Sequence, residues 1–486
     1  MPNNELQIAR QRVNVRWYHH PIDFANVLKA FIGSNYLGLP FAFFNSGLGL
    51  GIIGLVIIAS LTDHCCQLIV KCKKRVIINI MQKYQDTHCD ADFNTLVRLQ
   101  IRLEKHLDYA DIGNIVLGFT QTTTGYTQTT TGYTQTTPGY TQTTAYPQTT
   151  YTADNGTTAD FIEQFVSTAP NLEYLVLIPL PLFILFAYLR SIRNMGIVSA
   201  VANLSTFVAY FSVLYYLIEG FSIHPTVQWW KWSTFPIFFG QVTTNYEGIG
   251  TIIPIEASMD GNRHNYPRFL HGSILILGVM FASFGILGYG KYGDGVGQII
   301  TANLPQGTVV MVAVQIFLMI GVICTFPLQF FPIAEILEGY IFAEGKCCGP
   351  RRNANIRAVK EEERVSLLEA SDESLDELVP VAIAIPESVS WCKRYTFRTF
   401  VVLAAAGCAV LLRNFFSYVL SFVGAAGSAA LAYILPCFFH IRLGKGTISW
   451  PIFIKDVLII AFGVLGGVVG IVVTIQKIIE EVIEEQ

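Results

Sequence analysis

Two polar interruptions lie inside apolar stretches of this sequence, and their residue types suit the binding of a small charged molecule. The first stretch reads IGSNYLGLPFAFFNSG and the second reads NYEGIGTIIPIE. Glycine and proline interrupt an α-helix and leave backbone amides and carbonyls without intrahelical partners. Free amides at the positive end of a half-helix attract an anionic group, and free carbonyls attract a cationic group. The residues that would take part are Gly33, Ser34, Asn35 and Gly38 in the first stretch, and Glu247, Gly248, Gly250 and Thr251 in the second.

The two interruptions occupy matched positions, because each lies in the span that opens one half of the chain. Paired membrane helices that are interrupted by glycine and proline are typical of transporters built from two repeats, with the substrate between the unwound segments. An amino acid carries both an anionic and a cationic group, so it is the expected ligand. The competing interpretation is that glycine and proline are simply common in membrane helices, where they allow close packing. It explains one such helix well and two at matched positions poorly.

Ionisable residues inside the apolar stretches are further candidates for function, because burying a charge in the bilayer is costly. Glu247 lies beside the second interruption, where it either takes part in proton transfer or caps the loose backbone. His64 is either linked to protons or, as is commoner for a lone histidine, a packing residue. Asp63 and Glu256 lie nearer the cytoplasmic face, and we expect them to be solvated.

The composition indicates an integral membrane protein. Of the 486 residues, 52% are hydrophobic and 14% are charged, whereas soluble domains carry about 25% charged residues. The net charge of −3 gives no reason to expect a nucleic-acid partner, and the cysteines lack the spacing of a metal site. No polar stretch is long enough for an enzyme-sized soluble domain. We therefore expect no enzyme, no cofactor and no metal.

The apolar stretches predict an all-α, polytopic membrane protein. A span needs about 20 mostly apolar residues, and lysine and arginine accumulate in its cytoplasmic loops. By their lysine and arginine content, residues 10–16, 71–75 and 346–364 are expected to be cytoplasmic. The stretches that could span the membrane are 24–46, 48–70, 174–189, 195–218, 235–257, 269–289, 308–335, 397–412, 416–439 and 451–476.

A threonine-rich segment at 119–172 disturbs this pattern. The unit [FY]TQTT[TP]G repeats from Phe119, and no lysine or arginine occurs between His106 and Leu189. Such sequence is typical of a solvated stalk on the lumenal or extracellular side, and Asn155 begins an N-glycosylation acceptor. The chain is then inside at residue 75 and outside near 150, yet a threonine repeat cannot cross hydrocarbon by itself. One span is missing, and the repeat is either genuine or an error that replaced a helix.

Several stretches of the chain resemble the proton-coupled amino acid transporters, a branch of the amino acid/auxin permease family. The resemblance runs from about residue 23 to 476, and its most specific stretch is FFGQVTTNYEGIGTIIPIEASM. GSNYLGLPFAFFNSGLGLGIIGL, ICTFPLQFFPIAEIL and LSFVGAAGSAALAYILP are also similar. The resemblance implies eleven helices, the first ten forming two inverted five-helix repeats. It also implies proton-driven movement of small neutral amino acids, the glycine, alanine and proline class, into the cytoplasm.

The chain departs from this family pattern in two places that concern function. The third helix of the family should follow YADIGNIVLG, where the threonine repeat stands instead. The proton-sensing histidine of the family falls on Asn26, which cannot titrate, although Lys29 and His64 match a lysine and a histidine of the family. The residues expected near a proton path are Asn26, Lys29, His64 and Glu247. The rival hypothesis is a membrane amino acid sensor, or a paralogue that binds without transporting.

The predicted organisation is a cytoplasmic tail at 1–22, a transmembrane transporter domain at 23–476 and an acidic tail at 477–486. The domain includes the 119–172 insert and a disordered cytoplasmic loop at 343–396. ERVSLL in that loop resembles an acidic dileucine sorting signal, so the expected location is the plasma membrane or an endosomal or lysosomal membrane. The expected partners are small neutral amino acids, protons and membrane lipid.

Overall fold

The computed structural model describes residues 19–87, 96, 99–101, 103–104, 107, 109–117, 179–188, 196–259, 262–305, 309–342 and 389–484, and the regular secondary structure within these ranges is all helical. By length and composition, five of the described helices could cross a membrane: Leu48–Asp86, Arg263–Gly295, Trp391–Leu411, Phe416–Leu443 and Trp450–Ile483. Two shorter apolar helices, Leu204–Ile218 and Met311–Pro327, lie within longer ones. The all-α membrane fold is confirmed.

The helices follow the predicted spans in order. The first half contains α1 (His19–Lys29), η1 (Ser34–Gly38), α2 (Leu39–Ser46), α3 (Leu48–Thr87), α5 (Tyr109–Leu117), α8 (Leu180–Ala187) and α9 (Gly196–Ile218). The second half contains α10 (Phe235–Asn245), α11 (Ile249–Ser258), η3 (Arg263–Asn265), α12 (Tyr266–Tyr292), η4 (Gly293–Gly295), η5 (Ile300–Asn303) and α13 (Val309–Phe342). It continues with α15 (Trp391–Leu411), η7 (Arg413–Phe415), α16 (Phe416–Val423), the π-helical turns η8 (Gly424–Ser428) and η9 (Ala430–Ile434), α17 (Leu435–Leu443) and α18 (Trp450–Glu484).

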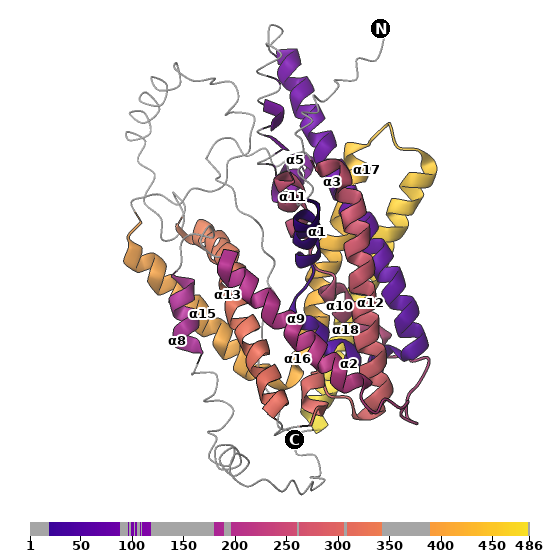
Figure 1. Cartoon of the computed structure of the whole chain (residues 1–486). Helices are drawn as coiled ribbons and strands as arrows, with labels where there is room; N and C mark the ends of the chain where they lie inside the picture. Colours follow the sequence, from indigo (N-terminus) through magenta and orange to yellow (C-terminus); the bar gives the residue numbers. More distant parts are fainter. Residues whose placement is uncertain are drawn as a thin grey trace, which may run out of the picture.

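Helix α3 extends well beyond the predicted span 48–70. Its later part carries charged residues, but it keeps one apolar face on which Val76, Ile77 and Tyr84 are buried. A search for apolar runs stops where the charges begin, whereas an amphipathic helix continues as long as one face is covered. In Figure 1 this end of α3 projects past the other helices.

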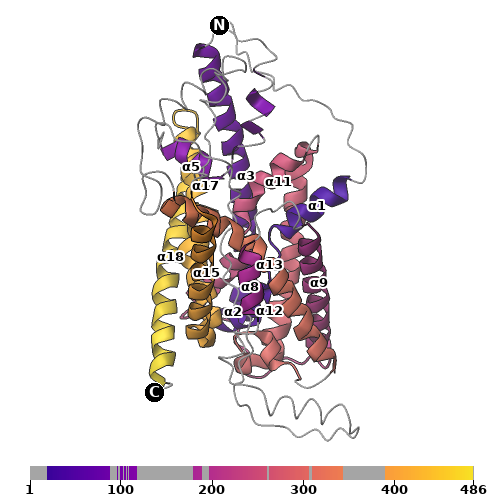
Figure 2. The same ribbon diagram turned by 90° about the vertical axis from the view of Figure 1, so that its left-hand side faces the viewer.

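Helix α18 likewise continues over residues 477–484, which were predicted to be a tail. Lys477 and Glu480 form an ion pair three residues apart, which stabilises a helix where the apolar run ends. At the other end of the chain α1 begins at His19, four residues before the predicted start of the transporter domain at residue 23. Figure 2 shows α18 ending at the side of the molecule opposite to the projecting end of α3.

The turn between α2 and α3 is held by the segment before α10. Gly47 has a φ of +76°, and a Cβ atom there would lie 2.8 Å from the backbone of Trp229. The amide of Gly49 donates to the carbonyl oxygen of Trp229 at 3.0 Å, and the amide of Lys231 donates to that of Ser46 at 2.9 Å. Only glycine suits this left-handed and crowded position. The turn therefore fixes the start of α3 against the beginning of the second half.

A main hydrophobic core and smaller clusters hold the described helices together. The main core brings together α2, α3, α10, α12 and α17, while a separate cluster of Ala187, Phe330, Ala334 and Val402 joins α8, α13 and α15. In Figure 1 these last three helices lie on one side of the molecule. Both carboxylate oxygens of Glu338 on α13, a fully buried residue, are bonded to arginines of α15, so this separate cluster is also tied by charge.

Candidate functional site

Both interrupted spans are broken in the structure, and glycine rather than proline marks each break. α1 ends at Lys29 and η1 begins at Ser34, so helical structure is lost over residues 30–33. In the second span α10 ends at Asn245 and α11 begins at Ile249. Pro40 occupies the first turn of α2, where a missing amide is tolerated, and Pro254 lies inside the continuous α11.

The two breaks lie directly against each other. A Cβ atom on Gly248 would stand 2.6 Å from Cδ1 of Phe31 and 2.9 Å from the carbonyl oxygen of Ala30. Both distances are shorter than a nonbonded carbon contact, so no larger residue fits at position 248 without displacing the first break. The absence of a side chain at this glycine therefore allows the two unwound segments to meet.

The first break places unpaired polar atoms in the protein interior. Gly33 is extended, with φ −127° and ψ −177°, and directs the chain into η1 through Ser34. Asn35 is 4% exposed, and its Nδ2 has no hydrogen-bond partner among the described residues. The hydroxyl of Tyr36 is also buried and unpaired in the described part of the chain. Buried polar groups are nearly always hydrogen-bonded, so such atoms mark a place where a water or a ligand is expected.

The second break contains a carboxylate beside a π-helical turn. The hydroxyl of Ser428, in η8, donates to Oε2 of Glu247 at 2.6 Å. The hydroxyl of Thr251 donates to the carbonyl oxygen of Gly248 at 2.8 Å, and Gly250 is buried in the first turn of α11. π-Helical turns occur frequently at functional sites because they place side chains where an α-helix cannot. Glu247 is therefore held between α10, α11 and the helix that contains η8.

Two tyrosines link the breaks to successive turns of α12. The ring of Tyr36 lies 4.9 Å from the ring of Phe284, and the ring of Tyr246 lies 5.1 Å from that of Phe281. Phe281 and Phe284 are three residues apart, so they occupy neighbouring positions on one face of the helix. The hydroxyl of Tyr246, like that of Tyr36, is buried without a partner among the residues described.

Gln241 is a site residue that no sequence motif indicated. Its Nε2 donates to the carbonyl oxygen of Gly38 at 2.8 Å and to Oγ of Ser417 at 3.2 Å, so one side chain joins η1, α10 and α16. The carbonyl of Gly38 is thus already paired. The available signal was a glutamine within an apolar span, because such an amide is expected to find a partner on a neighbouring helix. The same reasoning applies to Ser428.

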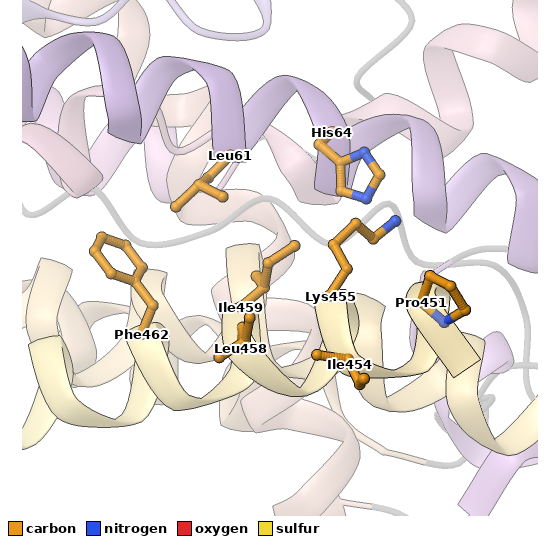
Figure 3. A pocket seen from close by; sticks show the side chains of 8 residues that line it. All are labelled: Leu61, His64, Pro451, Ile454, Lys455, Leu458, Ile459 and Phe462. Carbon is orange, nitrogen blue, oxygen red and sulfur yellow. The ribbon is translucent and has the colours of Figure 1, made fainter. Parts of the chain in front are cut away.

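The structure separates the residues that were expected near a proton path. Asn26 lies on α1 and is exposed, and Lys29 is the last residue of that helix. His64 lies on α3 and faces α18, where it lines a groove with Lys455 (Figure 3). All residues that line this groove come from α3 and α18, so His64 is not brought together with Glu247.

Two carboxylates that we expected to be solvated are paired instead. Glu256 is 4% exposed, and its Oε2 lies 3.2 Å from Nζ of Lys73. Oδ2 of Asp63 lies 2.8 Å from Nδ1 of His271. The expectation was wrong because it considered only distance along each span, whereas helix packing brings Lys73 of α3 to the end of α11 and His271 of α12 to Asp63 of α3. The threonine repeat, Asn155 and residues 343–388 lie outside the described residues.

The comparisons with known proteins concern nearly the whole chain. A family model described as "Transmembrane amino acid transporter protein" matches residues 22–476. The chain is 25% identical over 460 residues to amino acid transporter AVT3B of Arabidopsis thaliana, covering 91% of this chain and 90% of that protein.

Two further relatives are matched over a smaller share of their length. Proton-coupled amino acid transporter-like protein pathetic of Drosophila melanogaster is 27% identical over 321 residues, which is 64% of this chain and 62% of that protein. Vacuolar amino acid transporter 3 of Saccharomyces cerevisiae is 25% identical over 453 residues, or 90% of this chain and 54% of that protein. The chain therefore spans less than two thirds of these two relatives.

The family match begins in α1 and includes both breaks, the buried Glu247 and the π-helical turns. Its relatives are transporters rather than enzymes. Together with the apolar helices, this match makes the chain a multi-pass membrane protein of the transmembrane amino acid transporter family, the amino acid/auxin permeases.

Proposed function

We propose that this protein carries small neutral amino acids together with protons into the cytoplasm. The observation that supports this most strongly is the contact between Gly248 and the segment of Ala30 and Phe31. It joins two unwound segments from the two halves of the chain, the arrangement in which transporters bind substrate. A family match over residues 22–476 supports an amino acid as the cargo.

The ends of the half-helices supply partners for both charged groups of an amino acid. The helical segments that begin at Ser34 and Ile249 present amides, and with them the positive end of a dipole. We assign the substrate carboxylate to these amides, around Gly33, Ser34 and Asn35 and around Gly248, Gly250 and Thr251. α1 and α10 end on the opposite side of each break and present carbonyls, which would accept hydrogen bonds from the substrate ammonium.

The side chains around the breaks favour a small substrate. Phe31, Tyr36 and Tyr246 are each at most 3% exposed, and all three lie at or beside the unwound segments. Aromatic rings at this density leave little space for a large substrate side chain. The hydroxyls of the two tyrosines and the amide of Asn35 provide donors without adding charge, which suits a neutral amino acid.

Glu247 is our candidate for proton coupling. It is the carboxylate at the second break, and its partner Ser428 can keep one hydrogen bond in either protonation state because a hydroxyl both donates and accepts. Asn26 and Lys29 flank the first break, and we assign them a supporting place in the path. His64 lies at a different surface, so we give it no direct part in the proposed coupling.

The names of two relatives support the proposed proton coupling, and they are compatible with more than one membrane as the location. The Drosophila protein is named proton-coupled, and the yeast protein is named vacuolar. We propose the plasma membrane or an endosomal or lysosomal membrane as the location.

Uptake into proteoliposomes tests the function directly. The purified full-length chain is expected to accumulate labelled glycine, alanine or proline when the outside is acidic, and to stop accumulating them when a protonophore removes the gradient. Labelled lysine and glutamate should be carried poorly. Saturable binding of the small amino acids without any flux would contradict the proposal and would identify a sensor or a transport-inactive paralogue.

A further inference from the structure

A groove between α3 and α18 has one apolar end and one cationic end. Its volume is about 460 Å³, within the range of about 300–1,000 Å³ that is usual for small-molecule sites. Figure 3 shows Leu61 and Phe462 at one end and His64 and Lys455 at the other. The lining residues are Leu61, His64, Pro451, Ile454, Lys455, Leu458, Ile459 and Phe462.

The position of the groove along α18 corresponds to the cytoplasmic leaflet of the membrane. α18 begins at Trp450, directly after a loop that contains Lys445 and that the charge rule places inside. At 1.5 Å per residue, Lys455 lies roughly 8 Å from the start of the helix and Phe462 roughly 18 Å from it. The cationic end therefore lies at headgroup level and the apolar end at the level of the acyl chains.

The apolar part of the groove opens outward, to the surface that faces lipid. The side chains of Ile454 and Leu458 are 50% and 63% exposed in the isolated protein. In a membrane, an open apolar groove at this depth is in contact with hydrocarbon, so an acyl chain is a suitable occupant.

Positive charge predominates at the headgroup end. The side chain of Lys455 is 43% exposed, and Lys71 lies seven residues after His64, on the same face of α3. Asp456 is the acidic group beside Lys455, at 3.4 Å, but it is fully buried and its other oxygen lies 2.6 Å from Nδ1 of His440. Nε2 of His64 is buried and has no hydrogen-bond partner among the described residues. This end can thus offer a lysine ammonium and an imidazole to an anion.

We propose that the groove between α3 and α18 binds an anionic glycerophospholipid of the cytoplasmic leaflet. The headgroup phosphate lies against Lys455 and His64, with Lys71 adding long-range attraction, and one acyl chain runs past Leu458 towards Phe462. Basic pockets between membrane helices on the cytoplasmic side are suited to such lipids, because the cations attract the headgroup phosphate and the apolar slot takes up an acyl chain.

Native mass spectrometry of the purified full-length protein tests this site. Phosphatidylserine is expected to remain bound to the wild-type chain in preference to phosphatidylcholine with the same acyl chains. Lys455→Gln should reduce that preference about fivefold, the effect expected for one lysine near an anionic membrane surface. Lys477→Gln is the matched control, because it removes a lysine of the same helix that lies at the far end and pairs with Glu480. Equal phosphatidylserine binding by the wild type and Lys455→Gln would overturn the proposal.

A second variant and a soluble competitor test whether the groove binds the acyl chain of the lipid as well as its headgroup. Leu458→Trp is expected to fill the groove and displace the lipid while leaving all charges in place, and its open position makes correct folding compatible with the larger ring. Glycerophosphoserine, which has the headgroup without acyl chains, should not compete at equal concentration. Full competition, or unchanged lipid retention in Leu458→Trp, would show that an anion rather than a lipid is recognised and would contradict the inference.

Discussion

At the scale of single residues, we expect substitutions of Gly248 and Glu247 to affect the candidate site most, for opposite reasons. Gly248 acts by having no side chain, since this allows the second break to touch Ala30 and Phe31. Glu247 acts through its side chain, which is held by Ser428 at 2.6 Å beside the same break. A change at position 248 should therefore affect the geometry of the site, whereas a change at position 247 should affect its charge.

Gly248→Ala is expected to reduce amino acid uptake at least about tenfold while the protein still reaches the membrane. The new methyl group would overlap Phe31, and overpacking of this kind costs about 1–3 kcal/mol. Uptake per molecule of purified protein in proteoliposomes measures the loss. The control is Gly407→Ala, because no atom lies within 4 Å of the Cβ position there. Normal uptake by Gly248→Ala would show that the breaks need not touch.

Glu247→Gln should separate binding from proton coupling. The amide keeps the shape and a hydrogen bond to Ser428, so affinity for the amino acid is expected to change by less than about threefold, a difference below 1 kcal/mol. Accumulation driven by a pH gradient should be lost, while exchange of labelled for unlabelled substrate continues. Glu480→Gln, on the exposed end of α18, is the control. Proton-driven accumulation that survives in Glu247→Gln would assign the coupling to another group.

At the scale of elements, the second broken span is fixed to α3 by a buried ion pair. Lys73 of α3 and Glu256 of α11 have side chains that are 2% and 5% exposed, and their charged atoms lie 3.2 Å apart. Nζ of Lys73 also donates to the carbonyl oxygen of Glu104 at 2.8 Å. Because α11 is short, this contact to the long α3 fixes its far end and thereby the angle at which it leaves the break.

Removing one partner of this pair should destabilise the protein more than removing both. Lys73→Met leaves a buried carboxylate unpaired, which is expected to cost about 3–5 kcal/mol. The double variant Lys73→Met with Glu256→Leu should regain most of the lost stability, because neither charge then remains buried. Thermal unfolding in a mild detergent, followed by intrinsic fluorescence, compares the three proteins. A double variant that is no more stable than Lys73→Met would show that the pair does not set the stability of this region.

At the scale of the whole molecule, the sides on which α3 and α18 end determine how the chain is oriented in the membrane. α3 and α18 end on opposite sides of the molecule, as Figure 2 shows. If α3 ends in the cytoplasm, as its lysines and arginine require, then α18 ends outside or in the lumen. An odd number of crossings is needed for this arrangement, which agrees with the eleven that the family resemblance implies.

Epitope tags can check that orientation. A tag after residue 486 is expected to be accessible only from the outer or lumenal side, and a tag inserted at Gly446 only from the cytoplasm. Gly446 is a suitable place because its φ is +86° and no atom lies within 4 Å of its Cβ position. Antibody access before and after selective permeabilisation provides the readout, with an N-terminal tag as the cytoplasmic reference. Finding the tags at residues 446 and 486 on one side would exclude α18 as a single crossing.

The sequence by itself determined the class of the protein, the order of its apolar helices and the two places where a span is broken. These features depend on local composition, because a long apolar run favours a membrane span and glycine beside polar residues weakens a helix at that point. Only the tertiary structure decided which residues meet. Ser428 and Glu247 are 181 residues apart, Gln241 and Gly38 are 203 apart, and Lys73 and Glu256 are 183 apart. Such pairs are created by the way helices pack, and the polar groups in them gain partners that no local pattern in the chain can reveal.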